Sequence, residues 1–177
     1  MDIGIVSSRY AKALYQFAVA HNQQDEVYAA MNTLSSSYRE VPRLSIILEN
    51  PSMNANDKLH LLLTASGDSA ISCLDTFFKM VIHKGRVNML PFIVQSFIRV
   101  YLDKKNMIKC HLTVSSRLSD KTVERIKSIV EDKTNKTVEF SLSIDPAIIG
   151  GFVLEYNANC LDASVAGQLK AIRKQIV

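Results

Sequence analysis

Several residue types and patterns are absent or scarce in this chain of 177 residues, and each absence excludes a class of protein. Tryptophan is absent, and the three cysteines (Cys73, Cys110 and Cys160) stand far apart, with no Cys-x-x-Cys or Cys/His spacing that would hold a metal. No apolar run is long enough to span a bilayer, and the N-terminus has no basic segment followed by an apolar one. We therefore expect buried free thiols in a reducing compartment, no metal site, no transmembrane helix and no secretory signal.

The composition favours a folded protein without pointing to a substrate. Apolar residues make up 47% of the chain, enough to bury a core, and the net charge is +4. This positive charge is compatible with an anion-binding patch, as in a nucleic-acid-binding module. The basic residues are scattered along the sequence, which favours ordinary solvated faces, and both interpretations stay open. A single-strand-binding module would also need aromatic side chains on a basic strand face, and this pattern is missing. The four histidines lie on different segments without a nucleophile cluster, so the sequence predicts neither an active site nor a small-molecule substrate.

Residues 1–105 show helical periodicity throughout. Val6, Tyr10 and Phe17 recur at three- and four-residue steps that place them on one face. Asn54 followed by Asp57 is typical of a helix start, and Gly85 is typical of a helix end. Six helices are predicted, over residues 6–17, 24–39, 42–49, 54–66, 70–83 and 88–104. Because the connections between them are short, we expect a compact antiparallel bundle.

The period changes after Asn106. Residues 108–114 and 138–144 alternate apolar and polar side chains, which predicts two strands. A helix is predicted between them from Ser119 or Asp120, with these residues facing inward: Val123, Ile126, Ile129 and Val130. Residues 106–177 are therefore predicted to form a small α+β domain with the order strand, helix, strand, hairpin, helix. The fold class is a two-domain α+β chain, in which this domain follows the six-helix bundle.

Two adjacent glycines stand out in the C-terminal part. Asp145-Pro146 predicts a turn, and Gly150-Gly151 then supply backbone freedom before an apolar strand over residues 152–156. A phosphate-binding loop would continue into a helix and carry a lysine, so the two glycines are predicted to have a structural role.

The hairpin turn is predicted at residues 157–159. Asp162 and Ser164 are then predicted to cap a final helix, because short oxygen side chains satisfy its free amide groups. Val165, Leu169 and Ile172 recur on one face of that helix.

Three motifs occur in order along the chain. The first is Arg9-Tyr10-Ala11-Lys12-Ala13-Leu14 with Phe17-Ala18, and the second is His83-Lys84-Gly85-Arg86 followed by Leu90-Pro91. The third comprises Asp145-Pro146, Gly150-Gly151, Asp162, Ser164-Val165 and Leu169. In this order and spacing they resemble the motifs of the delta subunit family of F-type ATP synthases, to which the mitochondrial oligomycin-sensitivity-conferring protein is related.

The resemblance implies a structural function without chemistry or a cofactor of its own. Such a subunit belongs to the peripheral stalk and links the alpha/beta catalytic head to the membrane-anchored b subunits, so that proton-driven rotation is coupled to ATP synthesis. Residues 1–105 would bind the N-terminal helix of the alpha subunit, and residues 106–177 would contact the C-terminus of b. The implied location is peripheral, at the cytoplasmic face of a bacterial inner membrane, with no nucleic acid partner.

The resemblance also places the groove for the alpha helix on the first and fifth helices. The residues assigned to it are Tyr10, Ala13, Leu14, Phe17, Leu74, Phe77, Met80 and Val81. Small and apolar side chains of this kind would let a visiting helix approach closely. A helical bundle must also bury such stripes, so a core role for the same residues stays open. Two roles stay open for Arg86: binding the carbonyl end of the fifth helix, or binding a carboxylate of a partner.

Overall fold

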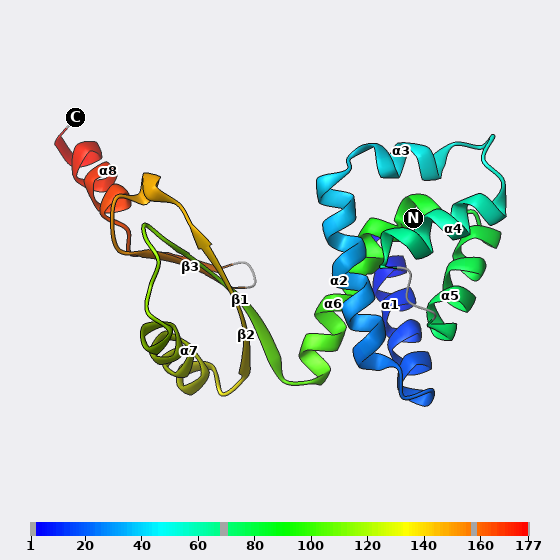
Figure 1. Ribbon diagram of the computed structural model, residues 1–177, viewed down its shortest axis with the longest axis horizontal. Helices are drawn as coiled ribbons and strands as arrows, with labels where there is room; N and C mark the ends of the chain where they lie inside the picture. The colour runs from blue at the N-terminus through cyan, green and yellow to red at the C-terminus, as the bar shows by residue number, and fades with distance from the viewer. Residues whose placement is uncertain (1–2, 68–70, 157–158, 177) are drawn as a thin grey trace. The chain divides into compact units, whose positions relative to one another are not determined.

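The computed structural model describes residues 3–67, 71–156 and 159–176, and it shows a mostly helical chain with one four-stranded sheet. The chain divides into two compact units, Met1–Tyr101 and Leu102–Val177. Figure 1 shows the helical unit from blue to green and the unit with the sheet from green to red. The first unit ends within the sixth helix, ahead of the boundary after residue 105 that the sequence predicts.

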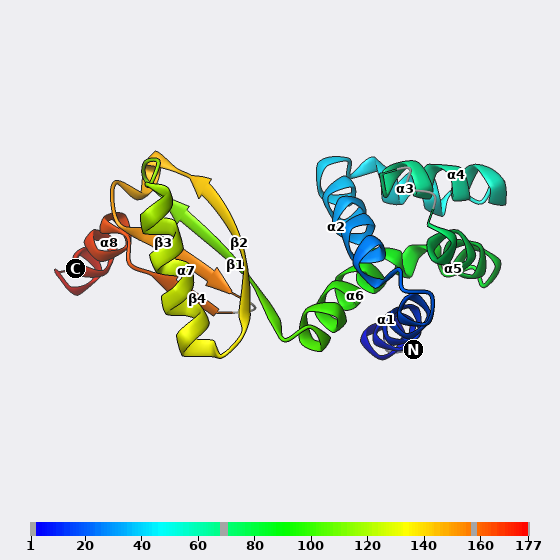
Figure 2. The ribbon, with the colours of Figure 1, turned by 60° about the horizontal axis from the view of Figure 1, so that its bottom comes forward.

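The first unit has a helix at each place where the sequence predicts one. The bounds are α1 Ile3–Ala20, α2 Gln24–Glu40, α3 Arg43–Glu49, α4 Ala55–Ala65, α5 Ser72–His83 and α6 Leu90–Lys104. A 3-10 helix, η1 (Val87–Met89), covers the predicted start of the sixth helix, and Ala70, the predicted start of the fifth, lies outside the described residues. In Figures 1 and 2, α3 crosses the end of α2, so a strictly antiparallel arrangement does not extend to α3.

Local sequence sets two of the helix ends. The Asn54 side chain accepts a hydrogen bond from the Asp57 N–H at 2.8 Å, which caps α4 as predicted. Gly85 follows α5 with a φ of 63°. The Gly85 N–H donates to the Ile82 carbonyl and the Arg86 N–H donates to the Val81 carbonyl, which is the Schellman pattern of a helix end. The predicted role of Gly85 as a helix terminator is confirmed.

The apolar stripes of the helices meet in a buried core. One face of α6 is buried at each of its apolar positions: Leu90, Ile93, Phe97 and Tyr101. The Tyr101 hydroxyl donates to the Asp25 carboxylate at 2.6 Å, and the Tyr28 ring stacks on the Tyr101 ring with centroids 3.9 Å apart. Because Asp25 and Tyr28 both belong to α2, polar and aromatic contacts join α6 to α2 in addition to the apolar packing.

The second unit has the predicted order of strands and helices. The bounds are β1 Met107–Val114, α7 Asp120–Thr134, β2 Thr137–Ile144, η2 Pro146–Ile148 (3-10), β3 Phe152–Tyr156, β4 Asn159–Asp162 and α8 Val165–Ile176. The sheet order is β2-β1-β3-β4, with β1 and β2 parallel and the other neighbours antiparallel. The parallel pair requires a crossover, and α7 supplies it. The predicted hairpin turn lies largely outside the described residues, because residues 157–158 are not described.

One face of the sheet packs into the core of this unit. Its buried residues are Ile108, Cys110, Leu112, Val114, Val138 and Leu154. Ile126 and Val130 of α7 pack against them. The predicted inward orientation of Ile129 is wrong: its side chain is exposed because it lies off the stripe formed by Ile126 and Val130.

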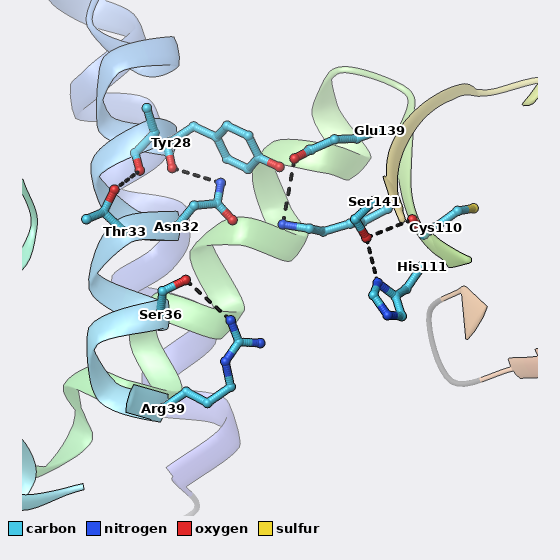
Figure 3. A network of polar contacts seen from close by, with 11 residues as sticks. Tyr28, Asn32, Thr33, Ser36, Arg39, Cys110, His111, Glu139 and Ser141 are labelled. Carbon is cyan, nitrogen blue, oxygen red and sulfur yellow. Dashed lines mark hydrogen bonds and ion pairs between the residues drawn. The ribbon is translucent and has the colours of Figure 1, made fainter. Parts of the chain in front are cut away.

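The opposite face of the sheet is polar (Figure 3). His111 Nδ1 is hydrogen-bonded to Ser141 Oγ at 2.8 Å. His111 Nε2 is hydrogen-bonded to Ser143 Oγ at 3.0 Å. Ser141 also donates to the Cys110 carbonyl at 3.2 Å, and Lys109 pairs with Glu139 at 3.6 Å. Cys110 and His111 thus point to opposite faces, as the alternation of a strand predicts.

The three cysteines are free thiols, but they do not share one environment. Cys73 and Cys110 are buried, as predicted, whereas Cys160 is exposed. Cys160 belongs to β4, a strand of four residues at the edge of the sheet. The prediction of a buried Cys160 is therefore wrong, because an edge strand is covered on fewer sides than a central one.

Candidate partner-binding surfaces

Helices α1 and α5 pack together and leave apolar side chains on the surface along their contact. Phe17 is 36% exposed and Met80 is 41% exposed. Ala13 is also exposed, and Tyr10 is half-buried, with its ring edge-on to the Phe77 ring at a centroid distance of 6.4 Å. We call Tyr10, Ala13, Phe17 and Met80 the α1–α5 strip. Its small and apolar side chains are of the kind that accept an amphipathic helix.

Four of the eight residues assigned to the groove are core residues. Leu14, Leu74, Phe77 and Val81 are buried within the helical unit. These four side chains thus take the core role that the sequence left open. The other four residues assigned to the groove reach the surface and make up the α1–α5 strip.

Arg86 follows the Schellman turn, and its guanidinium contacts Tyr10 instead of the carbonyl end of α5. Arg86 Nη1 donates to the Tyr10 hydroxyl at 2.7 Å, and the guanidinium carbon lies 5.4 Å from the centre of the Tyr10 ring. The carbonyl end of α5 is instead bound by the backbone N–H of Arg86, which donates to Val81. Tyr10 and Arg86 lie far apart in the sequence, so no local pattern could have predicted this pair.

The turn before β3 is built as the C-terminal motif predicts. The Asp145 carboxylate accepts a hydrogen bond from the Ala147 N–H at 2.9 Å, which opens η2. Gly151 has a φ of 73°, and a Cβ there would lie 2.2 Å from the Ala163 carbonyl oxygen. Gly150 has a milder restriction, since its Cβ would lie 3.2 Å from Val165 Cγ2. Of the two glycines, Gly151 therefore carries the stronger steric and conformational requirement.

The start of α8 is a small hydrogen-bonded network. Ser164 Oγ accepts from the Gly167 N–H at 2.9 Å, and Ser164 N and Oγ both donate to the Asp162 carboxylate, at 2.9 Å and 2.6 Å. These bonds from Ser164 lower the pKa of Asp162. Sequence reasoning missed Gly167, although a Cβ there would lie 2.4 Å from the Asp162 carboxylate. A small residue three positions after a helix-capping serine is the signal that could have pointed to it.

Helix α8 presents apolar side chains on its surface. Leu169 is 54% exposed and Ile172 is 53% exposed, and Val165 is exposed as well. We call these three residues the α8 face. An amphipathic helix whose apolar face is not covered by its own unit is a candidate site for another chain.

Neither a metal site nor a membrane-spanning helix occurs in the part of the chain that the structure describes. No group of three or more His, Cys, Asp or Glu side chains is placed there to hold a metal ion. None of the helices in residues 3–67, 71–156 and 159–176 combines the length and the apolar character needed to cross a bilayer.

The sequence matches one protein family over nearly its whole length. A family model described as "ATP synthase delta (OSCP) subunit" matches residues 6–176. The chain belongs to this delta family. The resemblance that rests on the three sequence motifs is thereby confirmed.

Several bacterial members of the delta family are similar to the chain from end to end. "ATP synthase subunit delta" of Phocaeicola vulgatus is 37% identical over 178 residues, covering 100% of this chain and 96% of that protein. The delta subunits of Parabacteroides distasonis and Bacteroides thetaiotaomicron are 34% and 33% identical, and 96% of each is covered. The chain therefore spans nearly the full length of these delta subunits.

A solved structure shares the fold of the chain over nearly its whole length. A chain in the cryo-EM structure of the Toxoplasma gondii mitochondrial ATP synthase hexamer has a TM-score of 0.68 with 17% sequence identity. The similarity covers 96% of each of the two chains. At this level of identity the similarity concerns the fold alone.

Proposed function

We propose that this delta-family chain is a non-catalytic subunit of the peripheral stalk of an F-type ATP synthase. It links the alpha/beta catalytic head to the membrane-anchored b subunits, at the cytoplasmic face of a bacterial inner membrane. The observation that carries the proposal is the family match over residues 6–176. The chain has no active site of its own in this proposal, and its contribution to ATP synthesis is mechanical.

The mechanical role follows from the rotation of the central shaft. Rotation drags on the alpha/beta ring, and a link to the membrane must hold that ring still. The link has to survive each turnover, so slow dissociation matters more than fast association. A nanomolar link corresponds to roughly 12 kcal/mol, which a well-packed interface of standard size can supply.

The six-helix unit is the head-binding part in this proposal. The α1–α5 strip accepts the N-terminal helix of the alpha subunit, with Phe17 and Met80 as exposed apolar anchors. Ala13 lies one helical turn before Phe17 on α1, where a small side chain lets the backbone of a visiting helix come close.

Titration with a peptide of the alpha subunit N-terminus tests this site. Ala13→Asp is expected to weaken binding at least about tenfold, because the docked helix would bury an unpaired charge. Val19→Asp is the matched control, since Val19 is exposed on another face of α1. Equal affinities for the wild-type chain and Ala13→Asp, with helicity preserved in both, would show that the strip is not the binding site.

The α+β unit is the stalk-binding part in this proposal. The α8 face is exposed and apolar, and a helix of the b subunit can cover it by ordinary helix packing. Leu169 and Ile172 are the two most exposed residues of that face, so they are the proposed anchors for b.

Co-purification of the b subunit tests the stalk contact. The double variant Leu169→Ser/Ile172→Ser is expected to lose b while the unit stays folded, because exposed positions contribute little to its own stability. Lys170→Ser, on the same helix, is the control and should retain b. Retention of b by the double variant at wild-type yield would rule out the α8 face as the contact.

The alternative suggested by the net charge, a nucleic-acid-binding module, gains no support. The bacterial relatives are delta subunits, and the sheet of this chain carries hydroxyl, imidazole and paired charged groups on its polar face. Single-strand recognition would need aromatic platforms there.

A further inference from the structure

Arg86 is held in place at one end of the α1–α5 strip. One of its guanidinium nitrogens donates to the Tyr10 hydroxyl at 2.7 Å, and its charge lies over the Tyr10 ring at 5.4 Å. Tyr10 is itself packed edge-on against the buried Phe77. The position of the guanidinium is therefore fixed by two contacts to one ring, and that ring is fixed by the core.

The remaining donors of this guanidinium have no carboxylate to bind within the described residues. An arginine has five N–H donors, and one contact to a hydroxyl leaves most of them available. The ion pairs that the structure shows do not involve Arg86. A half-buried guanidinium without an acidic partner is a poor arrangement for stability alone, because its charge is partly desolvated without a compensating ion pair.

The surroundings of the strip are basic. Helix α1 contains no acidic residue, and α5 contains a single one, Asp75, which is paired with Lys79 at 2.6 Å. Arg9 lies next to Tyr10 in sequence, and Lys84 lies just after α5; both are exposed. A helix docked on the strip would thus meet positive charge at the Arg86 end, which favours an acidic partner.

We propose that Arg86 binds a carboxylate of the docked helix and thereby fixes where that helix stops along the strip. The inference rests on the proposed function and deepens it, since it assigns the partner an acidic residue near the position that contacts Tyr10. A guanidinium binds a carboxylate through two parallel N–H···O bonds, which add direction as well as affinity. Because Tyr10 already restricts the Arg86 side chain, less rotamer entropy is lost when the carboxylate arrives.

The distance along the strip fixes the pattern expected in the partner. Tyr10 and Phe17 are seven residues apart on α1, which is about 10 Å along a helix axis. The partner helix should therefore carry apolar anchors over about two turns, with the carboxylate at the end of that stretch that lies next to Arg86.

A double-mutant cycle tests the pair directly. The probe is a synthetic peptide of the alpha subunit N-terminal segment from the same organism, with each Asp or Glu replaced singly by Asn or Gln. Arg86→Gln is expected to weaken binding about tenfold and to reduce the dependence of affinity on salt. At one peptide position, the loss of affinity caused by the peptide substitution and the loss caused by Arg86→Gln should not be independent. When both changes are present, the affinity should be at least about fivefold higher than the product of the two separate losses implies.

Three further variants separate the ion pair from a structural role. Arg86→Lys keeps the positive charge but lacks the planar guanidinium that donates two parallel hydrogen bonds. Its affinity for the peptide should lie between that of the wild-type chain and that of Arg86→Gln. Tyr10→Phe removes the hydroxyl that holds the guanidinium but keeps the ring, and should weaken binding less than Arg86→Gln does. Arg99→Gln removes an exposed charge from α6, which contributes nothing to the strip, and should leave affinity unchanged.

The outcomes distinguish this inference from the proposed function. If the wild-type peptide binds and Arg86 couples to no carboxylate, the inference is overturned while the strip remains the binding site. If the wild-type peptide does not bind the folded chain at all, the strip assignment and this inference fail together. Strong coupling to one carboxylate, with the salt dependence of affinity reduced in Arg86→Gln, supports both.

Discussion

Gly85 and Gly151 both adopt left-handed backbone angles, for different reasons. Gly85 has a φ of 63°, and a Cβ there would meet nothing within 4 Å. Gly151 has a φ of 73°, and its Cβ would meet the Ala163 carbonyl oxygen at 2.2 Å. The first glycine is required by conformation alone, and the second by conformation and by the close approach of another backbone segment.

These two glycines give a matched pair of substitutions. Gly85→Ala is expected to cost about 1 kcal/mol, the usual penalty of a left-handed alanine. Gly151→Ala should cost about 3 kcal/mol or more, since the backbone must also shift to relieve the clash. Urea unfolding resolved by hydrogen exchange in each unit measures both. Similar losses for the two variants would show that the Ala163 carbonyl imposes no steric requirement.

Asp162 gives the second unit a predictable dependence on pH. Hydrogen bonds from Ser164 lower the pKa of this carboxyl in the folded chain. A lowered folded-state pKa means that the stabilisation is present above the pKa of the unfolded chain and is lost as the pH falls through the folded one. The α+β unit should therefore lose this contribution at acidic pH, below the ordinary range of Asp.

An NMR titration of the Asp162 carboxyl measures this effect. The pKa of Asp162 should lie below its usual value in the wild-type chain and return toward that value in Ser164→Ala, because the variant lacks the hydroxyl that donates to the carboxylate. An equally low pKa in Ser164→Ala would show that the Ser164 hydroxyl does not lower it.

Among the helices, Tyr101 and Tyr38 differ in their hydrogen bonding. Tyr101 on α6 donates to Asp25 on α2 at 2.6 Å. The Tyr38 hydroxyl on α2 is buried and has no hydrogen-bond partner among the described residues. Burial raises the pKa of both phenols, so both hydroxyls stay neutral at ordinary pH.

Phenylalanine substitutions at these two positions should have opposite consequences. Tyr101→Phe removes an interhelical hydrogen bond to a charged group and is expected to cost about 1–2 kcal/mol. Tyr38→Phe removes a buried hydroxyl without a protein partner and should be neutral or slightly stabilising. Thermal unfolding followed by circular dichroism compares them. A loss at Tyr38 equal to that at Tyr101 would mean that the Tyr38 hydroxyl makes a bond in solution.

Periodicity and caps predicted the elements well because both are local properties. Asn54 with Asp57, the glycine after α5 and the alternation in β1 each depend on residues within one turn or one strand. The candidate site was predicted less well, because exposure depends on which helices pack together. Leu14 and Ala13 are neighbours with similar apolar character, yet the packing of the helices buries Leu14 and leaves Ala13 on the surface.

At the scale of the whole molecule, each unit carries its own exposed apolar surface. The helical unit has the α1–α5 strip and the α+β unit has the α8 face. A protein that links two partners needs two separate binding surfaces. The family match covers both units, so neither surface is an addition to a shorter family domain.

The most direct test of the linking role is a bridging experiment with purified components. The alpha/beta head without its delta subunit and the soluble part of b are mixed with and without this chain, and complexes are identified by native mass spectrometry. We expect an assembly that contains the head, the chain and b, and that forms only when the chain is present. We also expect Ala13→Asp to release the head and Leu169→Ser/Ile172→Ser to release b. Association of b with the head to the same extent without the chain would contradict the central claim.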